Sequence, residues 1–267
     1  MNVRGKVIVV TGAGSGIGRA LTHKLLEEGA RVAAVDLNEA ALRETAELAG
    51  GRRDRVSTHV VNVSDRDAVD ALPGAVIEAH GAVDGLINNA GIIQPFVRLK
   101  DLPYEAIERV VNVNLYGVVY MTKAFLPHLL ERPVAHIVNV SSMGGFFPVP
   151  GQTLYGASKA GVKLLTEGLY AELIDTNVRV TVVFPGAIAT NITSNSGLAM
   201  PIGEDAAQNF PMTAPERAAE IIIRGMERDQ FQVYVGNDAK LMNFLYRLNP
   251  RSATRFMFNR MKALLPG

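Results

Sequence analysis

Short runs of β-branched and other apolar residues recur along the chain and alternate with stretches of helical periodicity. Six runs predict buried parallel strands: Lys6–Thr11, Arg31–Asp36, Val56–Val61, Val83–Asn88, Ala135–Val140 and Val178–Phe184. The helical patterns between them cover Ile17–Glu28, Glu39–Ala49 and residues 65–80, 103–131 and 154–174. We expect Pro73-Gly74 to kink or split the third helix. The alternation predicts one α/β domain of the Rossmann type, a doubly wound parallel sheet covered on both faces.

Length and composition narrow the possible functions. The chain has 267 residues, of which 48% are apolar, enough for the core of one large domain. The absence of cysteine excludes disulfides and thiolate metal sites and fits a reducing compartment, so we expect a cytoplasmic location. No apolar run approaches the roughly 18 residues of a membrane span. A net charge of +1 gives no reason to expect nucleic-acid binding, and the spacing of the five histidines suggests no metal site.

The last 29 residues differ in charge from the rest. Residues 239–267 carry six basic residues and no acid, which leaves 21 basic and 26 acidic residues, a net charge of −5, in residues 1–238. We therefore divide the chain into a catalytic domain, residues 1–238, and a basic amphipathic extension, residues 239–267. The extension can be a helix that closes the site or a subunit interface, a peripheral anchor on anionic lipid, or a solvated end. Residues 190–214 have weak periodicity and contain Pro201 and Pro211, so we expect a mobile substrate loop there.

A glycine-rich turn joins the first predicted strand to the first predicted helix. Residues 11–18 read T-G-A-G-S-G-I-G: Gly12 permits a tight turn, Gly16 lets a pyrophosphate approach the backbone, and Gly18 allows close helix packing. Asp36 ends the next strand, where a carboxylate would bind a ribose 2′-hydroxyl and repel a 2′-phosphate. The neighbours Ser15 and Leu37 carry no charge that would hold such a phosphate. The pattern predicts NAD rather than NADP, although Asp36 alone is also typical of a turn.

Tyr155 and Lys159 stand four residues apart in the 154–174 helix, so their side chains share one face. An ammonium beside a phenol favours the phenolate, and we expect it to lower the pKa of Tyr155 toward neutrality. Tyr155 would then exchange a proton with an alcohol, as a general base does. Ser142 follows the strand Ala135–Val140, and its hydroxyl would stabilise a developing alkoxide or, alternatively, only cap a turn.

These motifs, taken together in order, resemble the short-chain dehydrogenase/reductase family, in its branch of roughly 250-residue subunits. The resemblance extends to about residue 236 and rests on six blocks: T-G-A-G-S-G-I-G (11–18), N-N-A-G (88–91), Asn114-Leu115-Tyr116-Gly117, Ser141-Ser142, Y-G-A-S-K (155–159) and P-G-A-I-A-T (185–190).

The resemblance implies specific roles for residues in these blocks. It implies Asn114, Ser142, Tyr155 and Lys159 as the catalytic set, with Asn114 distorting its helix to anchor a water in a proton relay. It implies Ser141 as a backbone-tying neighbour and Asn88 as a sheet-stabilising residue. The implied cofactor site comprises Gly12, Ser15, Gly16, Ile17, Gly18, Asp36, Leu37, Asn62, Val63, Asn89, Ala90, Gly91, Tyr155, Lys159, Pro185, Gly186, Ile188 and Thr190.

One position departs from the family pattern. The family usually has Asp-Val after its third strand, where the Asp holds the adenine amino group, and this chain has Asn62-Val63. An amide oxygen also accepts hydrogen bonds, so we expect adenine binding to survive.

We therefore expect an NAD-dependent oxidoreductase that interconverts a secondary alcohol and a ketone by hydride transfer. Apolar residues around the predicted site, among them Ile93, Phe146 and Phe147, suggest a hydrophobic substrate or, alternatively, loop core or a subunit contact. The alternative function is a catalytically silent dinucleotide sensor or scaffold. The resemblance also implies a homotetramer or homodimer.

Overall fold

The protein folds around one parallel sheet. The computed structural model describes residues 1–190, 192–198, 212–262 and 265. Seven strands of this described chain lie in the order β3-β2-β1-β4-β5-β6-β7. Their bounds are Val7–Thr11 (β1), Arg31–Asp36 (β2), Val56–Val60 (β3), Gly85–Asn88 (β4), Ala135–Val140 (β5), Val178–Pro185 (β6) and Gln232–Val235 (β7). The strand order reverses between β1 and β4, which confirms the predicted doubly wound fold class.

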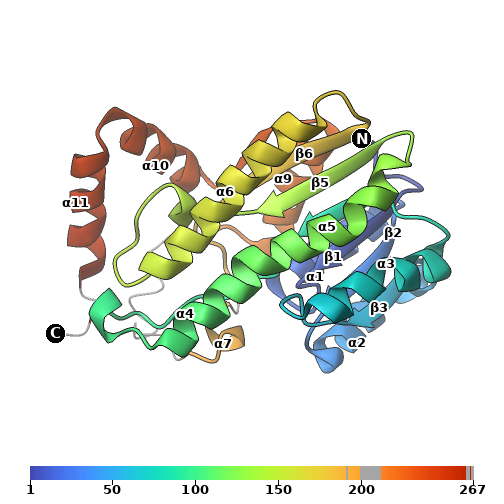
Figure 1. The fold of residues 1–267 in the computed structure, drawn as a ribbon, viewed down its shortest axis with the longest axis horizontal. Helices are drawn as coiled ribbons and strands as arrows, with labels where there is room; N and C mark the ends of the chain where they lie inside the picture. The colour runs from blue at the N-terminus through green and yellow to red at the C-terminus, as the bar shows by residue number, and fades with distance from the viewer. Residues whose placement is uncertain (191, 199–211, 263–264, 266–267) are drawn as a thin grey trace.

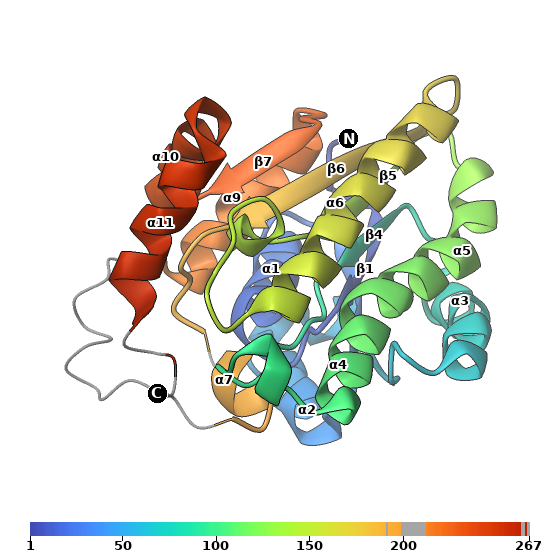
Figure 2. The same ribbon diagram turned by 60° about the vertical axis from the view of Figure 1, so that its left-hand side comes forward.

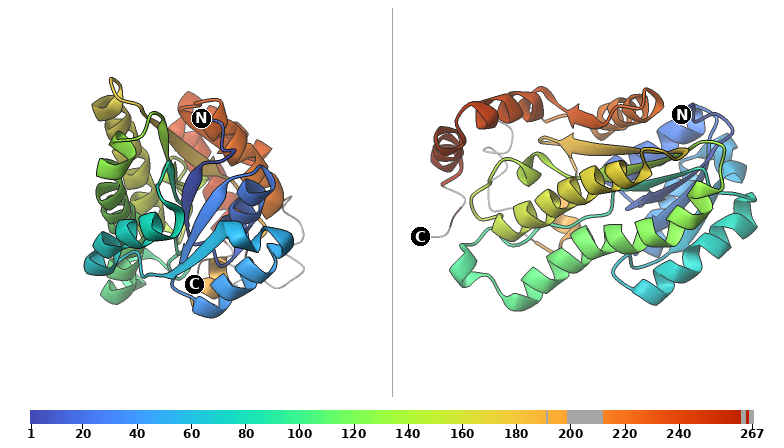
Figure 3. Two further views of the ribbon diagram at one scale, coloured as in Figure 1. Left: turned by 90° about the vertical axis from the view of Figure 1, so that its right-hand side faces the viewer. Right: turned by 45° about the horizontal axis from the view of Figure 1, so that its top comes forward.

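Helices cover both faces of the sheet (Figure 3, left). One face carries α1 (Gly16–Glu27), α2 (Glu39–Glu47) and α9 (Pro215–Glu227), and the other carries α3 (Arg66–His80), α5 (Gly117–Leu130) and α6 (Thr153–Leu173). Alternate residues of a strand face opposite sides. Ile8 and Val10 of β1 accordingly join one buried core, while Val7 and Val9 join the other. Both cores hold the strand ends in fixed positions at one edge of the sheet.

Three elements differ from the sequence prediction. The helix α3 is continuous through Pro73, because Val69, Leu72 and Val76 bury one face on both sides of the proline. The predicted 103–131 helix consists of α4 (Tyr104–Val111), a π-helical turn (Asn112–Tyr116) and α5. Both α9 and β7 lie in a stretch where the sequence analysis predicted no element.

The C-terminal extension is helical and lies beyond β7 at one end of the molecule (Figures 1 and 2). Its described residues lie mainly in α10 (Asn237–Leu248), which begins two residues before the extension, and in α11 (Pro250–Met261). The first part of the predicted substrate loop contains the short helix α7 (Ile192–Asn195). The centre of the loop, residues 199–211, lies outside the described residues, so its mobility stays a prediction. Among the described helices none is long and apolar enough to cross a membrane.

Candidate active site

A cleft of about 860 Å³ opens at the carboxyl ends of the strands, on both sides of the point where the strand order reverses. A parallel sheet of this kind places its ligand there. All predicted cofactor residues except Gly18 line this cleft, together with the predicted catalytic residues Ser142, Tyr155 and Lys159. Seven segments that are far apart in the sequence therefore meet in one place. The described residues contain no group of three or more side chains that could hold a metal ion.

The glycine turn between β1 and α1 forms the floor of the cleft. Gly12 and Gly16 have φ values of +67° and +51°, which L side chains rarely adopt. Gly18 lies behind the turn, where a Cβ would overlap the carbonyl oxygen of Gly12, so its role is close packing. Ser15, the N-cap residue of α1, makes no side-chain bond to the first turn of the helix. The free N–H groups of this helix end are suited to an anionic ligand.

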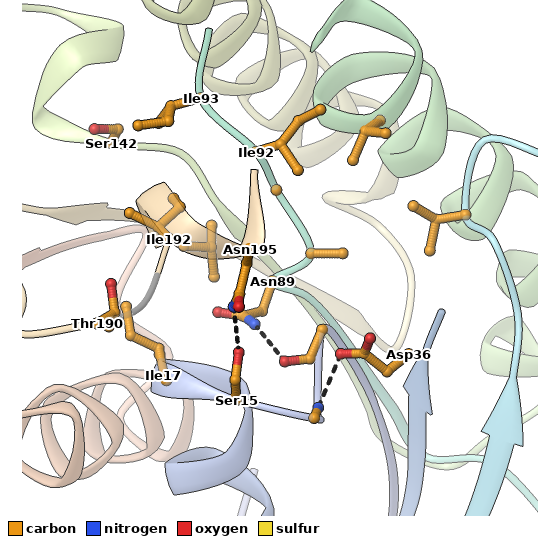
Figure 4. A pocket seen from close by; sticks show the side chains of 18 of the residues that line it. Ser15, Ile17, Asp36, Asn89, Ile92, Ile93, Ser142, Thr190, Ile192 and Asn195 are labelled. Atoms are coloured by element: carbon orange, nitrogen blue, oxygen red, sulfur yellow. Dashed lines mark hydrogen bonds between the residues drawn. The ribbon is translucent and has the colours of Figure 1, made fainter. Parts of the chain in front are cut away.

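Asp36 stands at the end of β2 and faces the same turn (Figure 4). Its Oδ2 accepts a hydrogen bond of 2.9 Å from Gly14 N, and its Oδ1 accepts one of 3.0 Å from Asn38 N. The carboxylate therefore has the turn contact that the sequence left as an alternative, and it also lines the cleft. Leu37 beside it is 66% exposed and brings no charge to the site.

Asn62 lines the cleft after β3, but its amide oxygen is already in use. Asn62 Oδ1 accepts hydrogen bonds from Ser64 N at 3.1 Å and from Ser64 Oγ at 2.8 Å. A carbonyl oxygen has two lone pairs, so both are occupied. No described residue accepts a bond from Asn62 Nδ2, which leaves this side chain as a donor. The expected contact of this oxygen with an adenine amino group stays a prediction, and it would have to compete with the bonds from Ser64.

The N-N-A-G segment after β4 is tied to β1 and β5. Asn88 Nδ2 donates to Asn139 Oδ1 at 2.9 Å inside the sheet, consistent with the stabilising role that the resemblance implied. Asn89 Nδ2 donates to Thr11 O at 2.9 Å, and Thr11 Oγ1 accepts from the backbone N–H of Asn89 and Ala90. These bonds hold the segment beside the glycine turn, where it forms one wall of the cleft.

Ser142 and Tyr155 meet at the other end of the cleft, around Gly144. Ser142 Oγ accepts a hydrogen bond of 3.0 Å from Gly144 N. A Cβ on Gly144 would lie 3.3 Å from Tyr155 Cε1 and 3.4 Å from Ser142 Oγ, so the glycine keeps the two side chains close. Ile93 lies near Ser142 in this part of the cleft (Figure 4). A carbonyl oxygen placed here would face two hydroxyl groups.

Lys159 and Asn114 form the buried layer behind this pair. Lys159 is 3% exposed, and its Nζ donates to Val140 O at 3.0 Å. Asn114 belongs to the π-helical turn, as its predicted helix distortion requires. Its Oδ1 accepts from Ile92 N, and its Nδ2 donates to Ile92 O, each at 2.9 Å. A Cβ on Gly91 would lie 3.1 Å from Lys159 Nζ and 3.3 Å from Asn114 Oδ1, so the two polar groups approach the cleft at the same point.

The protonation of Tyr155 and Lys159 is governed by burial. Burial raises the pKa of the Tyr155 hydroxyl, and a hydrogen bond with Ser142 acts in the opposite direction. Burial also lowers the pKa of Lys159 from 10.5 to about 8. We predicted that Lys159 lowers the pKa of Tyr155, and in the protein without a dinucleotide this lowering is not found. Desolvation of the phenol dominates its pKa, and Lys159 Nζ is bonded to Val140 O.

The segment after β6 lies over the cleft between its two ends. Asn195 Nδ2 donates to Ser15 Oγ at 2.7 Å, which connects α7 to the glycine turn (Figure 4). Ser196 Oγ accepts from Ile93 N at 3.0 Å, and Arg109 Nη2 donates to Ser196 O at 3.2 Å. The beginning of the predicted substrate loop is therefore fastened to three separate elements.

Comparison with known proteins agrees with this geometry. The family model described as short chain dehydrogenase matches residues 6–200. SadH of Mycobacterium tuberculosis, provisionally named as an oxidoreductase, is 38% identical over 262 residues, which cover 95% of this chain and 94% of SadH. The chain belongs to the short-chain dehydrogenase family. It is thus an oxidoreductase by family.

Two crystal structures of family members show how similar the fold is. A short-chain dehydrogenase/reductase from Burkholderia phymatum in complex with NAD is 29% identical, with a TM-score of 0.80, over 88% of this chain and 90% of that one. A short-chain dehydrogenase from Burkholderia cenocepacia in complex with NADP is 27% identical, with a TM-score of 0.81, over 96% and 99% of the two chains. The family fold therefore accommodates both dinucleotides, and the choice between them depends on individual residues.

Several residues of the site were missed by the sequence analysis. Asp238, in the first turn of α10, has an Oδ2 that accepts from Ala187 N at 2.7 Å and so holds the turn after β6. A Cβ on Gly186 would collide with this carboxylate, so the contact with the first turn of α10 requires a glycine at this position. Gln94 Oε1 accepts a hydrogen bond of 2.9 Å from the backbone N–H of Tyr155. Single polar residues in loops carry no periodic signal, so these contacts were visible only in three dimensions.

The C-terminal helices cover the loop that follows Ser142. Phe147 is completely buried in a small core with Ala253 and Met257 of α11, and Met143 and Tyr246 pack against it. Phe147 therefore belongs to the loop core, one of the three interpretations of this segment, and it does not line the described cleft. Of the predicted apolar liners, Ile93 does face the cleft. The inner side of the extension helps close the catalytic end of the molecule.

Proposed function

We propose that the protein is an NAD-dependent oxidoreductase that interconverts a secondary alcohol and a ketone, with Tyr155 as the acid–base residue. The observation that carries this proposal is the convergence of Ser142, Tyr155 and Lys159 on one cleft whose other end holds Asp36 and the glycine turn. A dinucleotide fits between these ends, since the turn leaves backbone N–H groups free and Gly16 allows close approach. When bound, the nicotinamide would supply or accept the hydride.

The side chains of the catalytic end would handle the oxygen and its proton. In reduction, Tyr155 gives its phenolic proton to the carbonyl oxygen, and in oxidation it takes the proton back. Ser142 donates a hydrogen bond to the same oxygen and stabilises the charge that develops there. The hydrogen bond between Ser142 and Tyr155 acts against the burial that raises the pKa of Tyr155, and the ammonium form of Lys159, four residues along α6, would further favour the phenolate during oxidation. Asn114, held by Ile92, would anchor the water through which Lys159 exchanges protons with solvent.

Asp36 supports NAD as the preferred dinucleotide. Its carboxylate ends β2 within the cleft, and a 2′-phosphate placed beside it would meet a like charge. No basic residue stands at Ser15 or Leu37 to compensate.

A hydrophobic substrate is supported by the walls around the catalytic end. Ile92, Ile93 and Ile192 line the cleft on the side of Ser142 (Figure 4). Apolar walls favour the burial of an apolar ligand, while the hydroxyl pair orients its single oxygen.

The test is an NADH-coupled screen of hydrophobic ketones and alcohols, with Tyr155→Phe as the control. We expect turnover with at least one class of ketone and a loss of about 10²–10⁴-fold in Tyr155→Phe. Undiminished turnover in that variant would contradict the mechanism. Tight NADH binding without turnover on any substrate would favour the alternative, a silent sensor or scaffold, which the retained Ser142, Tyr155 and Lys159 argue against.

We also propose that the outer side of α10 contacts anionic lipid. Leu241, Phe244 and Leu248 recur at helical spacing and are 52%, 60% and 68% exposed, with Lys240 and Arg247 beside them. Apolar and basic residues on one amphipathic helix are typical of interfacial binding to anionic membranes.

Vesicle flotation tests this contact in the full chain. We expect recovery with phosphatidylglycerol-containing vesicles but not with neutral ones, and loss of recovery in Phe244→Ser/Leu248→Ser. The control is Leu48→Ser, because Leu48, the C-cap residue of α2, is similarly exposed (60%) and lies outside α10. Equal recovery of the α10 variant and the wild type would contradict the lipid contact.

A homo-oligomer is supported by exposed apolar residues on α6. Leu164 and Tyr170 of α6 and its C-cap residue Ile174 are 69%, 40% and 56% exposed, and a subunit contact over this helix would remove them from water. Light scattering after size exclusion would detect the dimer or tetramer, and a monomer at micromolar concentration would contradict it.

A further inference from the structure

Gln94 is a fully buried polar residue in the loop between β4 and α4. Its exposed fraction is 0%, and it lies three residues beyond Gly91. It does not line the cleft, so it has no direct part in binding a cofactor or substrate. Buried polar side-chain atoms are usually hydrogen-bonded, so the partners of Gln94 indicate its role.

The partners of Gln94 are the first residues of the helix that carries Tyr155. Gln94 Oε1 accepts hydrogen bonds from Leu154 N at 2.8 Å and from Tyr155 N at 2.9 Å. Gln94 Nε2 donates to Gly151 O at 3.0 Å. In return, the backbone oxygen of Gln94 accepts from Gln152 Nε2 at 2.8 Å. One side chain thus holds both the loop before α6 and the second and third residues of α6.

These bonds replace a local helix cap. The first four N–H groups of a helix have no partner within the helix. Gln152, the N-cap residue of α6, makes no side-chain cap bond, and the first turn contains no acidic residue. Gln94 therefore supplies the capping oxygen from about 60 positions away in the sequence, and one of the two N–H groups that it binds belongs to Tyr155 itself.

We propose that Gln94 is a positioning residue for the reaction: it fixes the backbone of Tyr155, and thereby the phenolic oxygen, relative to Ser142 and the reacting carbonyl. The inference rests on the proposed function of Tyr155. Gln94 itself lies outside the cleft, but the same loop carries Ile92 and Ile93, which line the cleft wall. The loop thus connects this wall to the backbone of Tyr155. A displacement of the substrate wall would therefore be transmitted to the acid–base residue.

The neutral amide has a second consequence for Tyr155. A carboxylate at position 94 would keep an acceptor for the two N–H groups but would place a negative charge near the phenol. A neighbouring negative charge disfavours the phenolate and raises the pKa of Tyr155. Alcohol oxidation needs the deprotonated phenol, so the rate of oxidation in Gln94→Glu should reach its plateau at a higher pH than in the wild type.

The test compares Gln94→Met with Gln152→Met in the full-length enzyme. Both changes remove a buried amide from the same loop–helix junction, but only the first removes the bonds to Leu154 N and Tyr155 N. We expect kcat to fall about 10- to 100-fold in Gln94→Met, as misplacement of a catalytic group does, with the Kd for NADH unchanged. Gln152→Met should keep kcat within a few-fold of the wild type.

The conservative variant Gln94→Glu provides the second measurement. It should restore most of the kcat lost in Gln94→Met and shift the pH profile of alcohol oxidation upward. Wild-type kcat in Gln94→Met, equal losses in both methionine variants, or a reduced kcat in Gln94→Glu with an unshifted profile would each overturn the inference. Activity retained in Tyr155→Phe would instead overturn the proposed function, so the two failures are distinguishable.

Discussion

The two ends of the cleft are built in different ways. The dinucleotide end is a local structure: the strand β1, the glycine turn, α1 and the residue that ends β2 follow one another within residues 7–36. The catalytic end is assembled from four distant segments, and side-chain hydrogen bonds such as those of Asn114 and Gln94 hold them together. The first end is therefore tolerant of changes elsewhere in the chain, while the second depends on single buried polar groups.

This contrast predicts different kinetic effects for changes at the two ends. Substitutions of Ser142 and Tyr155 at the catalytic end should lower kcat and leave dinucleotide affinity intact. Substitutions at the dinucleotide end should lower affinity and leave kcat intact at saturation. The predictions below test this separation.

After Tyr155, the largest effect is expected at Ser142. Ser142→Ala removes one hydrogen-bond donor to the reacting oxygen and should lower kcat by about 10²–10³-fold, as loss of an oxyanion donor does. Its neighbour Ser141 offers a matched control, since Ser141 Oγ donates to Lys159 O at 2.7 Å and faces the core. Ser141→Ala should lower stability by about 1 kcal/mol and change kcat only a few-fold. Steady-state kinetics and chemical denaturation measure both, and the reverse pattern would reassign the two serines.

The next effect concerns Asp36. Asp36→Ala should weaken NADH binding by about 10- to 100-fold, because a hydrogen bond to a charged group contributes about 1.5–3 kcal/mol. Asp36→Asn keeps an acceptor for Gly14 N but removes the charge, so the preference for NADH over NADPH should decrease. The chain has no tryptophan, so NADH fluorescence reports binding directly. An unchanged preference in Asp36→Asn would contradict the role of the carboxylate.

A smaller effect is expected from the protonation of Lys159, whose pKa burial lowers to about 8. The ammonium form exists below this pKa and attracts the anionic dinucleotide. NADH affinity should therefore be highest below pH 8 and fall as the pH rises above it, by no more than about tenfold per pH unit for one linked proton. Lys159→Met should show a flat profile between pH 7 and 9. The same decline in that variant would assign the titration to another group.

The smallest effect is expected at Asn62. Its oxygen is occupied by Ser64, so its Nδ2 is the group that remains to bind adenine. Asn62→Asp removes this donor and should weaken NADH binding by a few-fold, the effect of about one neutral hydrogen bond. Tighter binding in Asn62→Asp would show instead that the oxygen faces the adenine amino group.

The same contrast explains how far the sequence could predict the molecule. Glycines at fixed offsets between a strand and a helix specify their own geometry, so the turn and the position of Asp36 were predictable. The alternation of strands and helices predicted the doubly wound fold class but neither β7 nor the strand order. The family blocks located Ser142, Tyr155 and Lys159, and the π-helical turn at Asn114 followed from the resemblance. The contacts of Gln94 and Asp238 were not predictable, because no local pattern links residue 94 to residue 155 or residue 238 to residue 187.

The pKa shifts of the residues in the cleft also could not be predicted from the spacing of residues in the sequence. The i, i+4 relation of Tyr155 and Lys159 is correct, since both lie on α6. Spacing does not show that Lys159 Nζ bonds to Val140 O or that burial outweighs its charge at the phenol. The direction of the pKa shift therefore depended on the depth of the site, which only the folded chain reveals.

The most direct test of the central claim is a single turnover with NADH deuterated at C4 and a hydrophobic ketone found in the screen. We predict that deuterium appears on the carbinol carbon of the product, and that Tyr155→Phe binds NADH with the same Kd but transfers the label about 10²–10⁴-fold more slowly. Product without deuterium, or transfer at the wild-type rate in Tyr155→Phe, would contradict hydride transfer with Tyr155 as the acid.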